Sequence, residues 1–305
     1  TVESLVQGLL CGQPEALAAL AQRSSLWRRV LRPTPWLERA LEGHALLPPG
    51  TAFVTGVVTQ LPHAGAIRAR NAAALWDSTG RLRGTAGKVH LVPVAEDPYP
   101  WMYVPGAIAA LHAVGGYVPD FVADAQPGVL EFEAPGRGPW RMAVGICYDN
   151  VFDDPFVTPL RAGEVDFFLV LSNEAWYEDS LEMDHMLASA RLRAVSSGRS
   201  VVRATNSGIS AVIDPSGEIL AVLEDQRGRR KMVRGTLAAT VPVPVVGRGA
   251  ERGPRTIWVQ TAPWQVALWA LGLAFLIFRA GRPVTRPQRA GSAESDAVPA
   301  GSGEG

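Results

Sequence analysis

Residues 140–150 read WRMAVGICYDN, an apolar run that ends at Cys147 and is followed at once by polar side chains. A mostly apolar run with β-branched members and a glycine is typical of a buried strand. Cys147 is therefore expected at the end of a strand, at the sheet edge where open α/β folds bind their ligands. The alternative is that Cys147 is a small buried hydrophobic residue, as most free cysteines are.

Other apolar runs of strand length alternate with helical stretches along the chain. They lie at residues 52–58, 71–77, 165–171, 200–204, 208–213 and 219–223. The last two flank Asp214-Pro215-Ser216-Gly217, a strong hairpin signal. Apolar residues at three-and-four spacing predict a helix between residues 181 and 199. This alternation favours a layered α/β domain.

Composition excludes several classes of protein. The 305 residues carry 29 basic and 29 acidic side chains, so no overall charge favours nucleic acid as a partner. The two cysteines, Cys11 and Cys147, are too few for a disulfide framework and supply no metal-ligand spacing. With no glycine-rich phosphate loop either, we expect neither a metal nor a cofactor. Because the chain starts at Thr1 without a signal-peptide pattern, it is expected to be a piece of a longer protein or a processed product.

Residues 256–278, TIWVQTAPWQVALWALGLAFLIF, contain no charge. The run is long enough to cross a hydrocarbon layer of about 30 Å and is predicted to be a transmembrane helix, with a buried core helix as the alternative. Trp258 and Trp264 suit a membrane interface. A linker at 248–255 precedes the span. The tail, 279–305, is rich in Pro, Gly, Ser and Ala and is predicted to be disordered. The distribution of arginines slightly favours a cytoplasmic carboxyl end.

A cysteine nucleophile needs a nearby cation and a base, because an ordinary thiol is mostly protonated at neutral pH. The sequence singles out none of its five histidines as a partner: His44, His63, His90, His112 and His185. Lys88 and Lys231 are the only lysines. Lys88 lies in GKVHLVP beside an apolar run and is a candidate cation, although it can also be an ordinary surface lysine.

Several segments together resemble the apolipoprotein N-acyltransferases, a membrane branch of the nitrilase (carbon–nitrogen hydrolase) superfamily. The segments are KVHLVPVAE at 88–96, ICYD at 146–149, NEAWY at 173–177 and RATNSGIS at 203–210. The resemblance covers most of residues 1–225 and is densest between 140 and 220. A transmembrane helix after the catalytic domain fits these enzymes and does not fit soluble nitrilases.

The resemblance implies a four-layer αββα sandwich over residues 1–247, followed by one transmembrane helix. It also implies a Glu-Lys-Cys triad, with Lys88 and Cys147 as two members. The glutamate of the family follows its first long strand, and Glu3 in TVESL is the best match; the strand itself is expected to be missing here. Less well placed alternatives to Glu3 are Glu15, Glu38 and Glu42.

The implied reaction is acyl transfer through a Cys147 thioester, from a phospholipid to the N-terminal amine of a lipoprotein. Glu3 would act as base, Lys88 would stabilise the oxyanion and Glu96 would position Lys88 or the base. The resemblance places the catalytic domain on the outer face of the cytoplasmic membrane. It also assigns a set of residues to substrate binding: Glu96, Tyr148, Asp149 and Trp176. For Tyr148 and Trp176, packing in the core is the alternative.

Three positions depart from the pattern of the family. Asp149 and Glu174 each exchange one acidic residue for the other, and Ser196 stands where a glutamate is usual. Two other functions therefore stay open. One is a membrane-tethered amidase or nitrilase, in which water replaces the amine, and the other is a non-catalytic membrane homologue.

Overall fold

The computed structural model describes residues 50–63, 66–78, 81–93, 95–97, 106, 121–134, 137–163, 165–244 and 255–280. The chain divides into two units, Thr1–Ala262 and Pro263–Gly305. The first unit contains two sheets with helices, and the second contains one described apolar helix. The predicted α/β class is confirmed by these mixed sheets and by the helices packed on them.

The smaller sheet has three antiparallel strands in the order β1-β2-β3. They are β1 (Phe53–His63), β2 (Ala66–Trp76) and β3 (Leu82–Gly87). The larger sheet has six strands in the order β4-β5-β6-β7-β8-β9. They are β4 (Val129–Ala134), β5 (Arg137–Ile146), β6 (Phe167–Ser172), β7 (Val201–Thr205), β8 (Ala211–Ile213) and β9 (Ile219–Val222). Strands β5, β6 and β7 run parallel, and the outer pairs are antiparallel.

The two sheets pack face to face through alternate side chains. Ala73 and Leu75 of β2 belong to one buried cluster with Met142 and Val144 of β5 and Leu169 of β6. Because side chains alternate between the faces of a strand, the intervening residues of β5 and β6 point the other way. Both faces of β6 and of residues 142–145 of β5 are therefore buried, which explains their nearly continuous apolar sequences.

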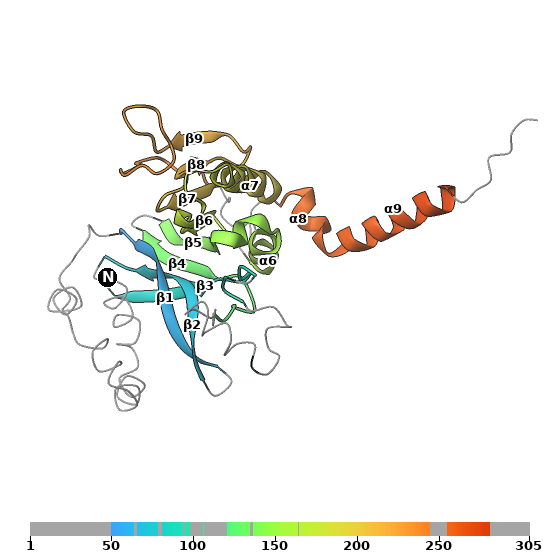
Figure 1. The fold of residues 1–305 in the computed structure, drawn as a ribbon, viewed down its shortest axis with the longest axis horizontal. Coiled ribbons are helices and arrows are strands. Elements are labelled where there is room, and N and C mark those ends of the chain that lie inside the picture. Colours follow the sequence, from blue (N-terminus) through green and yellow to red (C-terminus); the bar gives the residue numbers. More distant parts are fainter. Residues whose placement is uncertain are drawn as a thin grey trace, which may run out of the picture. The chain divides into compact units, whose positions relative to one another are not determined.

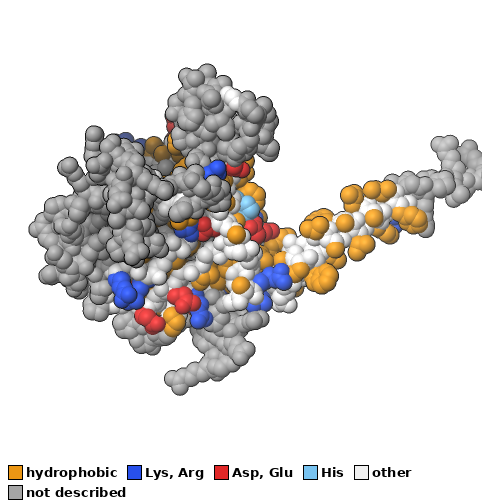
Figure 2. Space-filling view, turned by 90° about the horizontal axis from the view of Figure 1, so that it is seen from below, with side chains coloured by type: hydrophobic (Ala, Val, Ile, Leu, Met, Phe, Trp, Pro, Cys, Tyr) orange, Lys and Arg blue, Asp and Glu red, His pale blue; other side chains and the backbone are white. Residues whose placement is uncertain are grey.

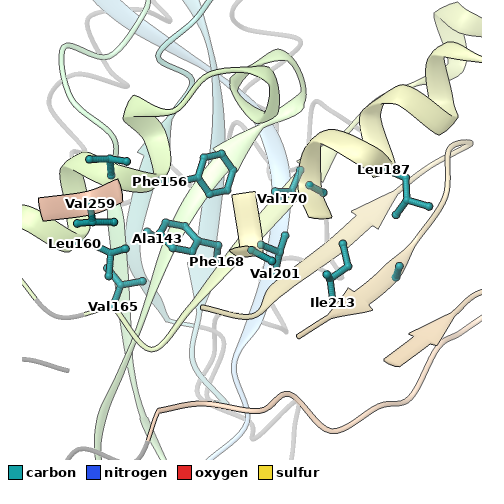
Figure 3. Close-up of a cluster of buried hydrophobic side chains, with 14 of the residues drawn as sticks. Ala143, Phe156, Leu160, Val165, Phe168, Val170, Leu187, Val201, Ile213 and Val259 are labelled. Atoms are coloured by element: carbon teal, nitrogen blue, oxygen red, sulfur yellow. The ribbon is translucent and has the colours of Figure 1, made fainter. Parts of the chain in front are cut away.

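Helices cover the other face of the six-stranded sheet. They are α6 (Asp154–Ala162), α7 (Glu182–Ser197) and the short α8 (Ile257–Thr261). Phe156 of α6 and Val259 of α8 are fully buried in one cluster with Phe168 and Val170 of β6, as Figure 3 shows. The described layers are thus helices, six-stranded sheet and three-stranded sheet, which can be followed in Figure 1. The fourth layer of the expected sandwich stays a prediction.

The second unit contains α9 (Gln265–Ala280), an almost entirely apolar helix. Its large side chains are exposed, and Figure 2 shows them as hydrophobic over the visible face of the helix. Helical residues Ile257–Arg279 are long and apolar enough to cross a membrane and are the one such candidate among the described residues. The helix is interrupted by a 3₁₀ turn at Ala262–Trp264, where Pro263 cannot donate a backbone hydrogen bond. Val259 lies before this turn and belongs to the core of the first unit.

Candidate active site

Three polar residues meet at the carboxyl edge of the parallel strands. Cys147 directly follows β5, Asn173 follows β6 and Asn206 follows β7. The Cys147 Sγ lies 3.9 Å from the backbone oxygen of Asn173, and the Asn206 side-chain amide donates to the Asn173 side-chain oxygen at 2.6 Å. The thiol therefore stands where the apolar run of β5 predicts it, at an edge built from the ends of neighbouring strands.

The backbone of Cys147 is unusual for a residue with a side chain. Its φ is +51°, and it opens the 3₁₀ turn Cys147–Val151 immediately after an extended Ile146. Left-handed backbone at a non-glycine residue costs on the order of 1 kcal/mol, and such residues cluster at functional sites. The side chain is half-buried. Cys147 is thus a residue on a sharp strand-to-turn corner and not a hydrophobic residue of the core.

Lys88 is buried and paired. It follows the last residue of β3, its side chain is only 1% exposed, and its Nζ donates to Glu96 Oε2 at 2.6 Å. This burial removes the interpretation of Lys88 as an ordinary surface lysine. A buried ammonium needs a partner with hydrogen bonds of its own, because an unpaired buried charge is very costly. Glu96 meets that need, so the two residues form one unit.

Asp149 joins the lysine loop to the cysteine turn. Its carboxylate accepts hydrogen bonds from His90 N at 2.7 Å, Val89 N at 3.2 Å and Ile146 N at 2.9 Å. The first two donors follow Lys88 directly, and the third precedes Cys147. Asp149 is fully buried, so these bonds are made away from solvent. One carboxylate thereby holds the segments carrying Lys88 and Cys147 against each other.

Burial raises the pKa of Asp149 above its ordinary value of 3.8, while the backbone donors and Lys88 oppose the shift. The native carboxyl then binds a proton at a pH where the unfolded chain has lost it, so acidification favours the native state. We predict that the stability advantage of the wild type over Asp149→Asn widens as the pH falls from neutral towards about 4, below which the unfolded chain is protonated as well. Denaturant unfolding of both proteins at several pH values measures this. A gap that narrows on acidification would contradict the prediction.

Two aromatic side chains of the site differ in their environment. The Tyr148 ring meets Phe152 edge-on at 5.0 Å, and Phe152 in turn stacks on His90 at 3.9 Å. Trp176 is 85% exposed, so it does not pack in the core. Its neighbour Tyr177 has its pKa raised to about 12, first by burial and then by the charge of Cys147. Tyr177 thus keeps its proton at neutral pH close to the thiol, and sequence reasoning gave it no role.

A buried ion pair links the elements that form the carboxyl edge of the parallel strands. The Arg203 side chain is bound to the Glu174 carboxylate, and both side chains are fully buried. Arg203 also donates to the backbone oxygens of Ile209, at 3.0 Å, and Met186, at 3.3 Å. Burial lowers the pKa of Arg203, and the charge of Glu174 works against that shift. The pair connects the ends of β6 and β7 with α7, and sequence reasoning did not predict it.

Some predicted positions lie outside the described residues. They are Glu3, its alternatives Glu15, Glu38 and Glu42, and the second cysteine, Cys11. Within the described residues, no group of three His, Cys, Asp or Glu side chains is placed to hold a metal ion. Of the predicted site residues, the structure brings together Lys88, Glu96, Asp149 and the turn of Cys147. The proposed base, Glu3, stays a prediction.

Comparison with known proteins gives consistent matches. The family model for carbon–nitrogen hydrolases matches residues 49–248. The apolipoprotein N-acyltransferase of Rhodopseudomonas palustris is 34% identical over 207 residues, which cover 66% of this chain and 35% of that protein. The one of Bradyrhizobium diazoefficiens is 33% identical over 208 residues, covering 67% and 36%. The chain thus spans about a third of the length of the curated relatives it matches.

Among solved structures, an amidase from Nesterenkonia sp. is 21% identical to this chain. The match covers 72% of this chain and 68% of the amidase, with a TM-score of 0.39. The region matched by the family model includes Lys88, Glu96 and Cys147, and it ends before the apolar helix α9.

Proposed function

The chain belongs to the carbon–nitrogen hydrolase family, and from this premise we propose that it supplies the catalytic domain of a membrane N-acyltransferase. The observation that carries the proposal is the placement of Cys147 on a strained turn at the sheet edge, tied through Asp149 to the buried Lys88–Glu96 pair. The similarity to apolipoprotein N-acyltransferases supports acyl transfer to nitrogen of a lipoprotein. In the proposal, the acyl donor is a phospholipid and the acceptor is the N-terminal amine of the lipoprotein.

In the first half-reaction, Cys147 attacks the ester carbonyl of the phospholipid. The base takes the thiol proton, the Sγ–carbon bond forms, and the carbonyl oxygen becomes an oxyanion. When the carbon–oxygen ester bond breaks, the leaving glycerol oxygen receives the proton from the base. The products are a Cys147 thioester and a lysophospholipid. Glu3 is proposed as the base.

In the second half-reaction, the α-amine of the lipoprotein attacks the thioester. The same base accepts a proton from the amine, the carbon–nitrogen bond forms, and the carbon–sulfur bond breaks. The proton returns to sulfur, so the free thiol is regenerated. The acyl chain stays on the Cys147 sulfur as a thioester after the lysophospholipid leaves and until the lipoprotein binds. This order of events gives ping-pong kinetics.

Lys88 is proposed to stabilise the oxyanion of both steps. Its ammonium has three N–H bonds, and among the described residues Glu96 Oε2 is the acceptor of its Nζ. A preorganised donor in a site that excludes water contributes far more than the same donor in water. Trp176 and Tyr148 are proposed to contact substrate at the rim of the site, together with Glu96 and Asp149 beneath it.

We expect Lys88→Met to slow thioester formation by roughly 100- to 1,000-fold, the usual effect of removing one oxyanion donor. The matched control is Lys231→Met, which removes the other lysine, bound to Asp184 at 2.6 Å near the surface. Lys88→Met leaves the Glu96 carboxylate without its cation, which can destabilise the fold. The double variant Lys88→Met/Glu96→Gln removes that unpaired charge, so a slow reaction in the double variant reports the loss of the lysine and not a loss of stability. Single-turnover mass spectrometry measures the rate, and equal rates for both lysine variants would contradict the proposed role.

The membrane part of the proposal rests on the apolar helix. We propose that residues 1–247 form the catalytic domain, 248–255 a linker, 256–278 a membrane anchor and 279–305 a disordered tail. Because Val259 is buried in the core of the first unit, the part of this span that enters the membrane would begin only after α8. The proposal also places the domain on the outer face of the cytoplasmic membrane, beside its lipid substrate.

The test is the intact mass of the membrane-embedded protein, with any polypeptide that precedes Thr1 in the native protein included. After incubation with phosphatidylethanolamine, we expect an added acyl mass that maps to Cys147 and is released by the amine of a diacylated lipopeptide. Hydrolysis of a small amide without an acyl adduct would favour a tethered amidase. No reaction in either assay would favour a non-catalytic homologue.

A further inference from the structure

The carboxylate of Glu96 is held from three sides. Lys88 Nζ donates to Oε2 at 2.6 Å, and the backbone N–H of Val92 donates to the same oxygen at 2.8 Å. The third donor is the side-chain amide of Asn71, which reaches Oε1 at 2.6 Å. Asn71 lies on β2 of the three-stranded sheet, 25 residues away from Glu96 in the sequence.

Asn71 also holds the main chain of Lys88. The backbone N–H of Lys88 donates to the backbone oxygen of Asn71 at 2.9 Å, which extends the ladder beyond the pair Ala72–Gly87. One residue therefore contacts both ends of the lysine, the backbone directly and the ammonium through Glu96. Asn71 is itself half-buried, so its hydrogen bond to Glu96 is partly shielded from solvent.

The chemistry of the donor matters as much as its position. An amide donates to Oε1 without adding charge, while Oε2 accepts from the ammonium and from the Val92 N–H. A cationic donor here would compete with Lys88 for the carboxylate. A side chain that can only accept hydrogen bonds would repel the Glu96 carboxylate. Both would change the direction in which Glu96 holds the lysine.

We infer that Asn71 is a positioning residue for Lys88, acting through Glu96. The inference rests on the proposed function, since its catalytic consequence is the alignment of Lys88 with the oxyanion. The charged groups facing this network are Lys88 and Glu96 themselves, the Asp149 carboxyl, on which the charge of Lys88 acts, and, through the bond of Asp124 to Gly87 N at 2.9 Å, the Arg70–Asp124 pair. Nothing in this set replaces the amide donor to Oε1.

Two variants of similar size test the inference. Asn71→Leu removes the donor, and Asn71→Asp replaces it with an acceptor of the same shape. A carboxyl that faces a carboxylate keeps its proton to a higher pH than a free carboxyl does, and the protonated carboxyl introduced by Asn71→Asp can donate as the amide does. Lowering the pH should therefore rescue Asn71→Asp and leave Asn71→Leu unchanged. This difference separates positioning from a general loss of structure.

The first measurement does not need the enzyme to turn over. With only two lysines in the chain, ¹⁵N-lysine labelling of Lys231→Arg leaves a single side-chain ammonium signal, that of Lys88. Burial and the Glu96 bond should slow its exchange with water enough for it to be seen. We expect the signal to disappear in Asn71→Leu at neutral pH, and to return in Asn71→Asp as the pH falls from about 8 to about 5, the range in which the paired carboxyl takes up its proton. Because acid slows the exchange of every ammonium with water, the two variants are compared at each pH, and the signal of Asn71→Asp should return at a higher pH than that of Asn71→Leu.

The second measurement is the single-turnover rate of thioester formation in the membrane-embedded protein. A small misplacement of a catalytic group costs up to about 100-fold in rate, so we expect both variants to lose about 10- to 100-fold at neutral pH with KM unchanged. An intact ammonium signal in Asn71→Leu would overturn the inference, as would equal rate losses in both variants at every pH. If the wild type forms no thioester, the proposed function fails, and the ammonium signal alone decides the role of Asn71.

Discussion

Changing Cys147 to alanine should abolish the acyl adduct completely, because no other thiol that could carry the thioester is found among the described residues. The fold should survive the change. The thiol is half-buried, and the contact of its sulfur with the Asn173 backbone oxygen is a long 3.9 Å. We therefore expect a loss in unfolding free energy of no more than about 1 kcal/mol. Intact mass after incubation with phospholipid and denaturant unfolding measure the two effects.

The matched control uses the only other cysteine of the chain, Cys11. Cys11→Ala should keep the full adduct. An adduct that persists in Cys147→Ala and is lost in Cys11→Ala would move the nucleophile and end the proposal for Cys147.

A second test at position 147 concerns its backbone conformation. Its φ of +51° is tolerated by glycine at no steric cost, whereas alanine and cysteine are both strained there. Cys147→Gly should therefore unfold with a free energy about 1 kcal/mol higher than Cys147→Ala, although both are inactive. A higher stability of Cys147→Gly than of Cys147→Ala would show that a side chain at this position strains the turn. Equal stability of the two variants would show that the turn is relaxed.

The sequence made the position of Cys147 predictable because β5 is buried on both faces. Such a strand is nearly all apolar, so its end is marked by the change to Tyr148 and Asp149. Helix α6 was not predicted, because Pro155 and Pro159 interrupt the signals of a helix. Pro155 is tolerated in its first turn, where the backbone N–H needs no helical partner.

Most of the residues that hold the site in place could not be predicted from the sequence. Glu96 was found only through the resemblance of its segment, since spacing alone does not say that a loop returns its eighth residue to Lys88. Asn71 gives no signal at all, because it stands at the start of an alanine-rich stretch and its partner lies in a distant loop. Hydrogen bonds between side chains of different elements depend on how those elements pack, and no local pattern records them.

The second large effect is expected at Arg203, whose change to methionine should cost about 3 to 5 kcal/mol of unfolding free energy. The reason is the charge that stays behind. Glu174 is fully buried beside Arg203, and without the guanidinium its carboxylate loses its counter-charge. Gly208 packs so closely on this carboxylate that even a Cβ would collide with it, so Glu174 cannot turn towards that loop. Denaturant unfolding of the wild type and of Arg203→Met measures the loss.

The double variant Glu174→Leu/Arg203→Met distinguishes this cause from a general packing defect. Replacing both members of a buried ion pair with apolar side chains is often nearly neutral, so the double variant should recover most of the stability lost in Arg203→Met. The Ile209 and Met186 backbone oxygens would still lose their donor, which limits the recovery. If the double variant is no more stable than Arg203→Met, the unpaired charge is not what destabilises it. In that case the hydrogen bonds from Arg203 to the loop after β7 and to α7 hold this edge of the site together.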